Sequence, residues 1–366
     1  MDQSAPAPGG DLKSGPQPAA DAQNTPLLPL NTILVGDVRK KLRELPASAV
    51  DCIITSPPYF GVRDYGHDEQ LGAEESVEAW VNDLRSVCHE LARVLRPTGS
   101  LWLNLGDGYS RRPSEGARPK SLLLGPARLA MALCADGWVL RNQVVWAKSN
   151  PMPSSIGDRL TTAHESVYFF VRSRSYYFNL DAIRQPLVTT TRQAKQRQAS
   201  SGYPPSGTGL PQRKANDNRG LVRLRDAGVV GHPLGKNPGD VWSLPTAGYR
   251  GAHFAVFPSR LVERPLLATC PERVCSACGA AWQRELERRD GRLLAVGLLQ
   301  PACICQAEGR PGVVLDPFMG SGTTALVAEQ HGRHWIGIEL NPAYAHLATE
   351  RLRKARQKRA MDTGAA

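Results

Sequence analysis

Residues 312–339 restrict the fold of this chain more than any other stretch, because they are predicted to form a strand, a glycine turn, a helix and a second strand. The predicted strands cover 312–316 and 335–339, and the predicted helix between them covers 323–330. Two strands that are joined by a helix run parallel in one sheet. Because parallel sheets are covered by helices on both faces, this unit predicts an α/β protein.

The same alternation of apolar strands and amphipathic helices occurs in the first half of the chain. Strands are predicted over 31–37, 49–55, 100–105, 138–146 and 166–171, and helices over 38–45, 77–95 and 122–135. A further helix is predicted over 254–268. The expected fold class is therefore α/β with a doubly wound sheet.

The glycine turn has the features of a cofactor-binding loop. Residues 316–324 lead from a strand end into a helix N-terminus, and Gly320 and Gly322 let the backbone approach a ligand. Glu339 ends the next predicted strand, where a carboxylate accepts hydrogen bonds from ribose hydroxyls. A Walker A phosphate loop is disfavoured because no lysine precedes Thr323. NAD stays open as a ligand, although the acidic Asp316 suits the cationic methionine end of S-adenosylmethionine and would repel a pyrophosphate.

A second loop, Thr55-Ser56-Pro57-Pro58-Tyr59, follows the apolar run 49–55 and is the more specific signal. Its two prolines remove two amide donors and hold the backbone in an extended turn. Such a turn can aim the Ser56 hydroxyl and the Pro57 carbonyl at one point and offer Tyr59 as a stacking face for a base. These acceptors suit an exocyclic base amine whose lone pair faces a methylsulfonium. A rigid turn that ends an edge strand is the purely structural alternative.

These two loops, in this order along the chain, resemble those of the β-class DNA amino-methyltransferases. The resemblance covers most of residues 30–355 and includes the segments 60–66, 101–107, 145–151 and 251–258. It implies a Rossmann-like S-adenosylmethionine-dependent methyltransferase sheet that is circularly permuted. It also implies that Asp37 approaches the cofactor adenine, that Phe254 to Pro258 line the methionine end, and that residues near 146–150 wall a flipped base. A helix N-cap is the alternative role for Asp37.

The expected site follows from the two loops and the resemblance together. The catalytic residues are expected to be Ser56, Pro57, Pro58 and Tyr59. The cofactor-binding residues are expected to be Asp37, Phe254, Pro258, Asp316, Pro317, Phe318, Gly320, Ser321, Gly322, Thr323, Glu339 and Asn341.

Ser56 bears on which base is modified. It stands where many adenine-modifying relatives carry Asp, and in this respect the chain resembles the cytosine-N4 subgroup. The expected reaction is therefore methyl transfer to N4 of a flipped cytosine in duplex DNA. Adenine N6 is the alternative, because a hydroxyl and a carboxylate can both orient an amine. An inactive methyltransferase-fold DNA-binding protein and an NAD-dependent oxidoreductase are the alternatives of other classes.

The charge of the chain points to a polyanionic partner. Its 45 Lys and Arg against 34 Asp and Glu give a net charge of +11, which attracts nucleic acid. The loop-rich residues 186–240 are expected to be a basic target-recognition insert, with a solvated loop as the alternative. The expected DNA contacts are Arg192, Lys195, Arg197, Arg213, Lys214, Arg219, Arg223 and Arg225. A separately encoded restriction endonuclease and a second copy of the chain stay open as further partners.

Cysteine usage and hydropathy indicate the compartment and a metal. The chain has no apolar run of about 18 residues and no signal-peptide pattern, so a cytoplasmic protein without a membrane partner is expected. Cys275 and Cys278 form a knuckle with the spacing of zinc ligands, and Cys303 and Cys305 supply a second pair. They predict a structural Zn²⁺ in a small zinc-ribbon-like insert, without Cys270. The remaining cysteines, Cys52, Cys88 and Cys134, are expected in the core.

Changes in composition and these motifs divide the chain into seven expected segments. Residues 1–25 form a disordered tail, because they contain almost no large apolar side chain. The catalytic half of the sheet covers 30–185, the target-recognition insert 186–240 and a helical region beside the cofactor 241–271. The zinc-knuckle insert covers 272–310, the cofactor-binding half 311–355 and a basic tail 356–366.

Overall fold

The computed structural model describes residues 28–62, 66, 69–186, 232, 234–247, 257–289 and 292–364. The eight basic residues expected to contact DNA, from Arg192 to Arg225, and the predicted cofactor residue Phe254 lie outside the described residues.

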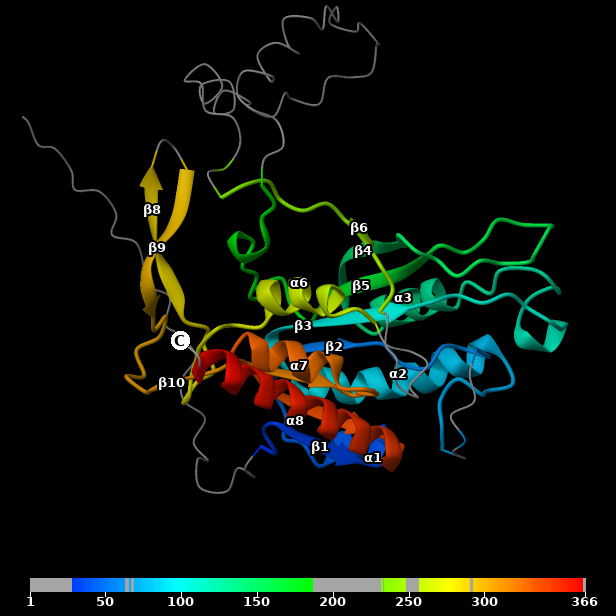
Figure 1. Cartoon of the computed structure of the whole chain (residues 1–366), viewed down its shortest axis with the longest axis horizontal. Coiled ribbons are helices and arrows are strands. Elements are labelled where there is room, and N and C mark those ends of the chain that lie inside the picture. Colours follow the sequence, from blue (N-terminus) through cyan, green and yellow to red (C-terminus); the bar gives the residue numbers. More distant parts are fainter. Residues whose placement is uncertain are drawn as a thin grey trace, which may run out of the picture.

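An eight-stranded sheet forms the centre of the molecule, with the strand order β1-β12-β11-β2-β3-β5-β4-β6 (Figure 1). Five neighbouring strands are parallel: β1 (Thr32–Val35), β12 (His334–Glu339), β11 (Val313–Asp316), β2 (Val50–Thr55) and β3 (Leu95–Leu105). Next to β3, β5 (His164–Val171) runs antiparallel to both β3 and β4 (Val139–Lys148). The strand β6 (Val241–Leu244) pairs with β4 in parallel at the edge.

Helices cover both faces of this sheet, which confirms the predicted doubly wound α/β class. The helices α1 (Val38–Arg43), α2 (Val77–Val94) and α3 (Gly125–Ala135) bury their apolar sides in one core cluster. The helices α6 (Ser259–Thr269), α7 (Thr323–Gln330) and α8 (Pro342–Gly364) contribute to a second cluster. In β2, Ile53 belongs to the first cluster and its neighbours Cys52 and Ile54 to the second, as the alternation of side chains along a strand requires.

The order in which the chain builds the sheet confirms the permuted arrangement. The strands β11 and β12 come from the C-terminal part of the chain, yet they lie between β1 and β2 from the N-terminal part. Val314 of β11 pairs with Cys52 of β2, and Leu315 pairs with Ile53. The loops that follow β2 and β11 therefore leave the same edge of the sheet from adjacent strands, although Thr55 and Asp316 are 261 residues apart.

Several predicted elements differ from the observed ones in their bounds. The helix predicted over 254–268 is observed as α6 (Ser259–Thr269), and the strand predicted over 31–37 as β1 (Thr32–Val35). The strand predicted over 100–105 begins at Leu95, because residues 96–99 form a bulge between the pairs Val50–Leu95 and Cys52–Ser100. The helix predicted over 122–135 begins at Gly125.

Of the three cysteines expected in the core, two are buried and one is exposed. Cys52 and Cys88 are buried, as predicted, but Cys134 is exposed. The prediction for Cys134 was wrong because α3 turns Leu129, Ala130 and Leu133 toward the core and leaves position 134 on its outer side.

Small elements lie outside the main sheet. The strands β7 (Val274–Cys275) and β10 (Gly309–Arg310) pair with each other, and β8 (Gln283–Arg289) and β9 (Arg292–Gln300) form a hairpin that stands away from the sheet (Figure 1). Two short 3-10 helices cover Pro113–Glu115 and Asp181–Ile183. No helix in the described part of the chain has the length and apolar character needed to cross a membrane.

Candidate active site

A cavity lies where the loops after β1, β2, β11 and β12 meet, at the carboxyl edge of the parallel strands. Its empty volume is about 880 Å³, including space that is open to solvent. Ser56 and Pro58 of the catalytic loop border it. Eight of the predicted cofactor residues line it: Asp37, Pro317, Phe318, Gly320, Ser321, Thr323, Glu339 and Asn341.

Glu339 holds the cofactor loop against the end of β12. Its Oε2 accepts a hydrogen bond from the Gly320 amide at 2.7 Å, and its Oε1 accepts one from the Asn341 amide at 2.9 Å. Burial raises the pKa of Glu339 above its ordinary value, although these amide hydrogen bonds act in the opposite direction. Each carboxylate oxygen has a second lone pair, so Glu339 can still accept hydrogen bonds from ligand hydroxyls.

Asp37 is the N-cap residue of α1, the alternative role that the sequence left open, and it also borders the cavity. Its side chain caps α1 by accepting hydrogen bonds from the amides of Arg39 and Lys40, at 3.0 and 3.1 Å. The same residue lines the cavity. Burial acts to raise the pKa of Asp37, but the hydrogen bonds from Arg39 and Lys40 hold it below its ordinary value. The carboxylate at this corner of the cavity is therefore ionised and fixed.

Helix α8 fixes the hydroxyl groups of the cofactor loop. Arg351 Nη1 donates to Ser321 Oγ at 3.0 Å and to Thr323 Oγ1 at 2.9 Å. Gly322 is not among the cavity-lining residues, and it has a φ of 77° at the start of α7. A side chain at this position would be strained and would lie 3.1 Å from the Ala348 Cβ. The contribution of Gly322 is therefore the shape of the turn.

Asp316 lies behind the cavity and links the two loops. It is buried and does not line the cavity. Its Oδ1 accepts from Thr55 Oγ1 at 2.7 Å and from the Phe318 amide at 3.2 Å, and its Oδ2 accepts from Thr324 Oγ1 at 2.7 Å. Burial raises the pKa of Asp316 to about 6, while the bonds from Thr55 and Thr324 lower it. Its position is that of a residue that aligns the loops rather than one that touches a ligand.

The segment before α6 supplies the remaining predicted cofactor residues. Phe257 lines the cavity, whereas Pro258 is the N-cap residue of α6 and is not among the lining residues. The cavity wall also includes Ile338, Leu340 and Tyr344, which the sequence did not indicate.

A cluster of polar side chains surrounds the catalytic loop; we call it the Tyr59 cluster, made of Ser56, Tyr59, Asn104, Lys148 and Glu165. Tyr59 Oη donates to Glu165 Oε2 at 2.7 Å. Asn104 Nδ2 donates to Tyr59 Oη and to Glu165 Oε2, both at 2.8 Å. Ser56 Oγ lies 3.2 Å from Tyr59 Oη and 3.3 Å from Asn104 Nδ2. Lys148 Nζ pairs with Glu165 Oε1 at 2.6 Å, and both side chains are largely sheltered from solvent.

The antiparallel strand β5 explains how this cluster forms. Because β5 runs against β3 and β4, its first residues lie at the edge of the sheet where β3 and β4 end. Asn104 pairs with Val167, and Glu165 pairs with Trp146. Trp146 itself is buried and donates from its indole to the Leu244 carbonyl oxygen at 3.0 Å, so it packs in the core.

The ring of Tyr59 packs against the backbone of the loop that follows β3. A Cβ at Gly106 would lie only 2.7 Å from Tyr59 Cε2, so a side chain there would displace the ring. Asn104 Oδ1 is buried and has no hydrogen-bond partner within the described part of the chain. The cluster thus has a fixed aromatic ring and unused acceptor capacity.

The sequence indicated some residues of the Tyr59 cluster but not all of them. Asn104 and Lys148 lie inside the segments 101–107 and 145–151 that carried the family resemblance. Glu165 had no such signal, because its place in the site depends on the pairing of β5.

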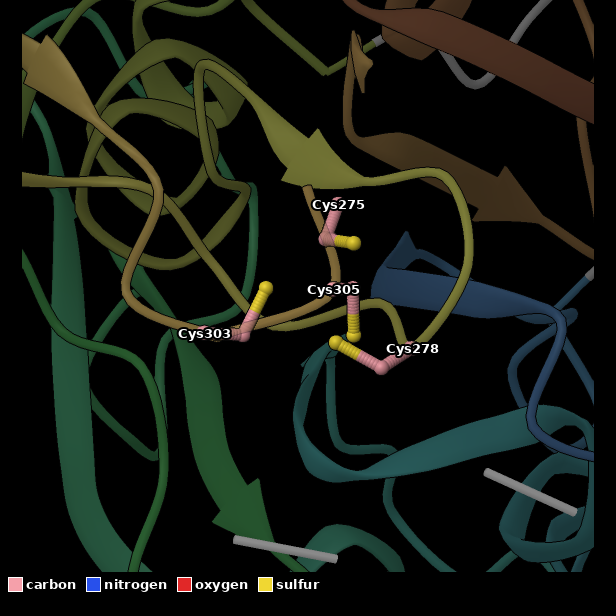
Figure 2. Close-up of side chains that lie close together, drawn as sticks. All are labelled: Cys275, Cys278, Cys303 and Cys305. Carbon is pink, nitrogen blue, oxygen red and sulfur yellow. The ribbon is translucent and has the colours of Figure 1, made fainter. Parts of the chain in front are cut away.

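The four cysteines that the sequence grouped as metal ligands come together. Their sulfur atoms all lie within 4.8 Å of one another and surround one space (Figure 2). The group lies between α6 and β11 along the chain, in the segment that carries the β8–β9 hairpin. Cys270 is buried apart from it and, as predicted, is not a member.

Comparisons with known proteins find relatives along most of the chain. The model of the N6/N4 DNA methylase family matches residues 50–350. The type II methyltransferase M.Cfr9I of Citrobacter freundii is 34% identical over 343 residues, covering 88% of this chain and 87% of that protein. The type II methyltransferase M.SmaI of Serratia marcescens is 32% identical, with 88% and 91% covered. Among solved structures, the cytosine-N4-specific PvuII DNA methyltransferase aligns with a TM-score of 0.48 and 18% identity, over 89% of this chain and 91% of that one.

Proposed function

The chain belongs to the N6/N4 family of DNA methylases, which use S-adenosylmethionine, and we propose that it methylates the N4 amine of cytosine in duplex DNA. The observation that carries the choice of base is Ser56, a neutral hydroxyl that borders both the cofactor cavity and the Tyr59 cluster.

The charge of the cavity wall fits S-adenosylmethionine. Asp37, Glu69 and Glu339 line the cavity, and no Lys or Arg is among the described residues that line it. Asp37 and Glu69 pair with Arg39 and Lys40 from outside the lining, at 2.8 and 2.6 Å, so the wall is only moderately acidic, but it offers no cation to a pyrophosphate. The apolar side chains of Phe257 and Phe318 provide surface for a flat ring. The same wall disfavours NAD, which carries a pyrophosphate.

The catalytic loop would position the target amine. S-adenosylmethionine supplies an electrophilic methyl group. The Ser56 hydroxyl and the Pro57 carbonyl accept hydrogen bonds from the amine and so direct its lone pair toward that methyl group. Tyr59 stacks on the flipped base. No covalent intermediate with the protein is needed, because the amine is itself the nucleophile.

Glu165 and Asn104 would act as positioning residues for the catalytic loop. Because the Tyr59 hydroxyl is held by Glu165 and Asn104, the ring cannot rotate away from the base. Lys148 holds Glu165 in turn. These are charge-assisted contacts in a largely sheltered place, where they are stronger than at an open surface.

Adenine N6 is the second candidate target, and Glu165 is the observation that favours it. The carboxylate of Glu165 lies in the same cluster as Ser56. Tyr59 and Asn104 already donate to its Oε2 and Lys148 pairs with its Oε1, so the second lone pair of Oε1 is what remains to accept from an adenine amine. Both reactions would use the same cavity and the same direction of attack.

We also assign residues 186–240 to target recognition. The two ends of this segment are joined, because Gln185 and Lys236 exchange backbone hydrogen bonds of 2.9 and 2.8 Å. Arg184 Nη1 adds a bond to the Gly235 carbonyl oxygen at 3.2 Å. Gln185 and Lys236, on either side of most of this segment, are therefore neighbours in the fold. Because the named relatives are type II methyltransferases, we further propose that the chain protects DNA against a separately encoded endonuclease.

Expression in a host without DNA methylation, followed by nucleoside mass spectrometry, tests the proposed reaction. We expect N4-methylcytosine in the host DNA, and far less of it with Ser56→Ala. N6-methyladenine in its place would replace the proposed base and leave the reaction class standing. Unmodified DNA from a folded protein that binds S-adenosylmethionine would contradict the proposed activity.

A further inference from the structure

We propose that Cys275, Cys278, Cys303 and Cys305 bind one Zn²⁺ ion that closes the base of the β8–β9 hairpin. The proposal concerns a part of the molecule outside the cofactor cavity and the Tyr59 cluster, and it does not depend on the reaction that the site performs.

The spacing of the sulfur atoms suits one metal ion. Four thiolates around Zn²⁺, each with a bond of about 2.3 Å, lie about 3.8 Å from one another in a tetrahedron. The four sulfur atoms all lie within 4.8 Å of one another, so small movements bring them to that geometry. All four cysteines are free thiols in the structure. Four thiolates in a tetrahedral arrangement select zinc or an iron–sulfur centre over harder cations such as Mg²⁺.

Backbone structure holds the two cysteine pairs together before any metal binds. The Gly279 amide donates to the Cys275 carbonyl oxygen at 2.9 Å, which closes the knuckle between the first two cysteines. Cys275 pairs with Gly309 across β7 and β10, and the Ser276 amide donates to the Glu308 carbonyl oxygen at 2.9 Å. The segment after the second pair therefore returns beside the first. Preorganised ligands of this kind lower the entropy lost when a metal binds.

Gly279 shows that the knuckle is also packed against the main sheet. Its φ is 72°, and a Cβ at this position would collide with the guanidinium of Arg96. Arg96 Nε pairs with the buried Asp51 at 3.1 Å, and Arg310, which ends β10, pairs with the same carboxylate at 3.7 Å. Two arginines thus attach the cysteine segment to the start of β2.

This attachment places the metal site away from the catalytic loop. Asp51 lies at the beginning of β2, whereas Ser56 follows the end of that strand. The four thiolates also occupy every position around the ion, which leaves none for substrate or water. We therefore assign the metal a structural role.

The β8–β9 hairpin is the part of the molecule that needs the metal. Its strands pair with each other and stand away from the sheet, and Leu298 of β9 is 81% exposed (Figure 1). An isolated two-stranded hairpin is at best marginally stable in water. Cys278 precedes β8 and Cys303 follows β9, so an ion shared by both pairs crosslinks the two strands at their base.

Metal analysis of the purified full-length protein tests the proposal directly. We expect about one zinc ion per chain, as for other four-thiolate sites. Replacing it with Co²⁺ should produce the visible absorption of tetrahedral, thiolate-bound cobalt. Protein without zinc, a stoichiometric iron content, or a disulfide within the cluster of freshly purified protein would each overturn the assignment.

A pair of variants separates metal binding from general folding. Cys303→Ser combined with Cys305→Ser should lose the metal, whereas Cys134→Ser, an exposed cysteine on α3, should keep it. In the wild type, a thiol-specific mercurial should release zinc as the four thiols react, which needs no variant to fold. Release should increase proteolytic cleavage within 283–300 and leave S-adenosylmethionine binding intact. Zinc retained by the double variant would contradict the ligand set.

Discussion

The cofactor cavity and the Tyr59 cluster lie at the same edge of the sheet, yet they are built in different ways. Most of the cavity is formed by loops that directly follow parallel strands. Each loop contributes a short run of consecutive or nearly consecutive residues to the lining. The Tyr59 cluster joins one loop to side chains from β3, β4 and β5, of which β5 is antiparallel. The difference suggests a division of labour, in which the cavity binds the cofactor and the cluster orients the base.

Of the changes considered, removal of the Ser56 hydroxyl should have the largest effect on kcat while leaving cofactor binding in the cavity unchanged. We expect Ser56→Ala to lower kcat by roughly 100- to 1000-fold, as loss of one preorganised polar contact to the reacting group does. Binding of S-adenosylmethionine, measured by calorimetry, should be retained. Ser86→Ala, an exposed serine on α2, is the matched control. An equal loss of cofactor binding in Ser56→Ala would end the separation of roles.

Asp316 links the two regions, and its ionisation should appear in the stability of the protein. Its pKa in the folded state is raised to about 6, above the ordinary value of 3.8. The stabilising contribution of the protonated carboxyl is therefore complete below about pH 4 and is lost as the pH rises to about 6, with a total on the order of 3 kcal/mol.

Denaturant unfolding at pH 4.5 and pH 7 checks this prediction. The free energy of unfolding of Asp316→Asn should depend less on pH than that of the wild type across this interval. Asp158→Asn, which removes an exposed carboxylate paired with Lys120, should change the profile little. Identical profiles for Asp316→Asn and the wild type would show that the buried carboxyl does not titrate in this range.

A substitution of Glu339 should lower cofactor affinity and spare kcat, the opposite of the effects expected for Ser56→Ala. We expect Glu339→Gln to weaken S-adenosylmethionine binding by roughly 10- to 100-fold, because hydrogen bonds to a charged group are worth about 1.5–3 kcal/mol. At saturating cofactor, kcat should return close to the wild-type value. A defect in kcat that saturation does not relieve would place Glu339 in the orientation of the base as well.

Glu165 should produce the smallest effect, confined to the cluster. We expect Glu165→Gln to lower kcat by about 10-fold, because a charge-assisted bond to Tyr59 becomes a neutral one. The KM for S-adenosylmethionine should change little, whereas the melting temperature should fall because Lys148 loses its charged partner. Tyr59→Phe should produce a similar loss of kcat. If Glu165→Gln instead raised only the KM for the cofactor, the residue would belong to the cavity.

The two loops were predictable because each is a continuous segment whose chemistry is local. Two prolines after an apolar strand restrict the backbone wherever that strand lies in the sheet. A glycine turn between a strand and a helix likewise indicates a ligand site without reference to the rest of the chain. The paired cysteines were predictable for the same reason, and their grouping in space followed.

The sequence by itself thus determined the fold class, the two loops and their order, and the four cysteines that meet. Only the tertiary structure decided that Glu165 joins the catalytic loop, that Asp316 holds two loops together from behind, and that Cys134 faces outward. Contacts of this kind depend on which strands are neighbours, in which direction they run and in what register. Side-chain alternation is the same for a strand of either direction, so the sequence pattern does not specify these relations.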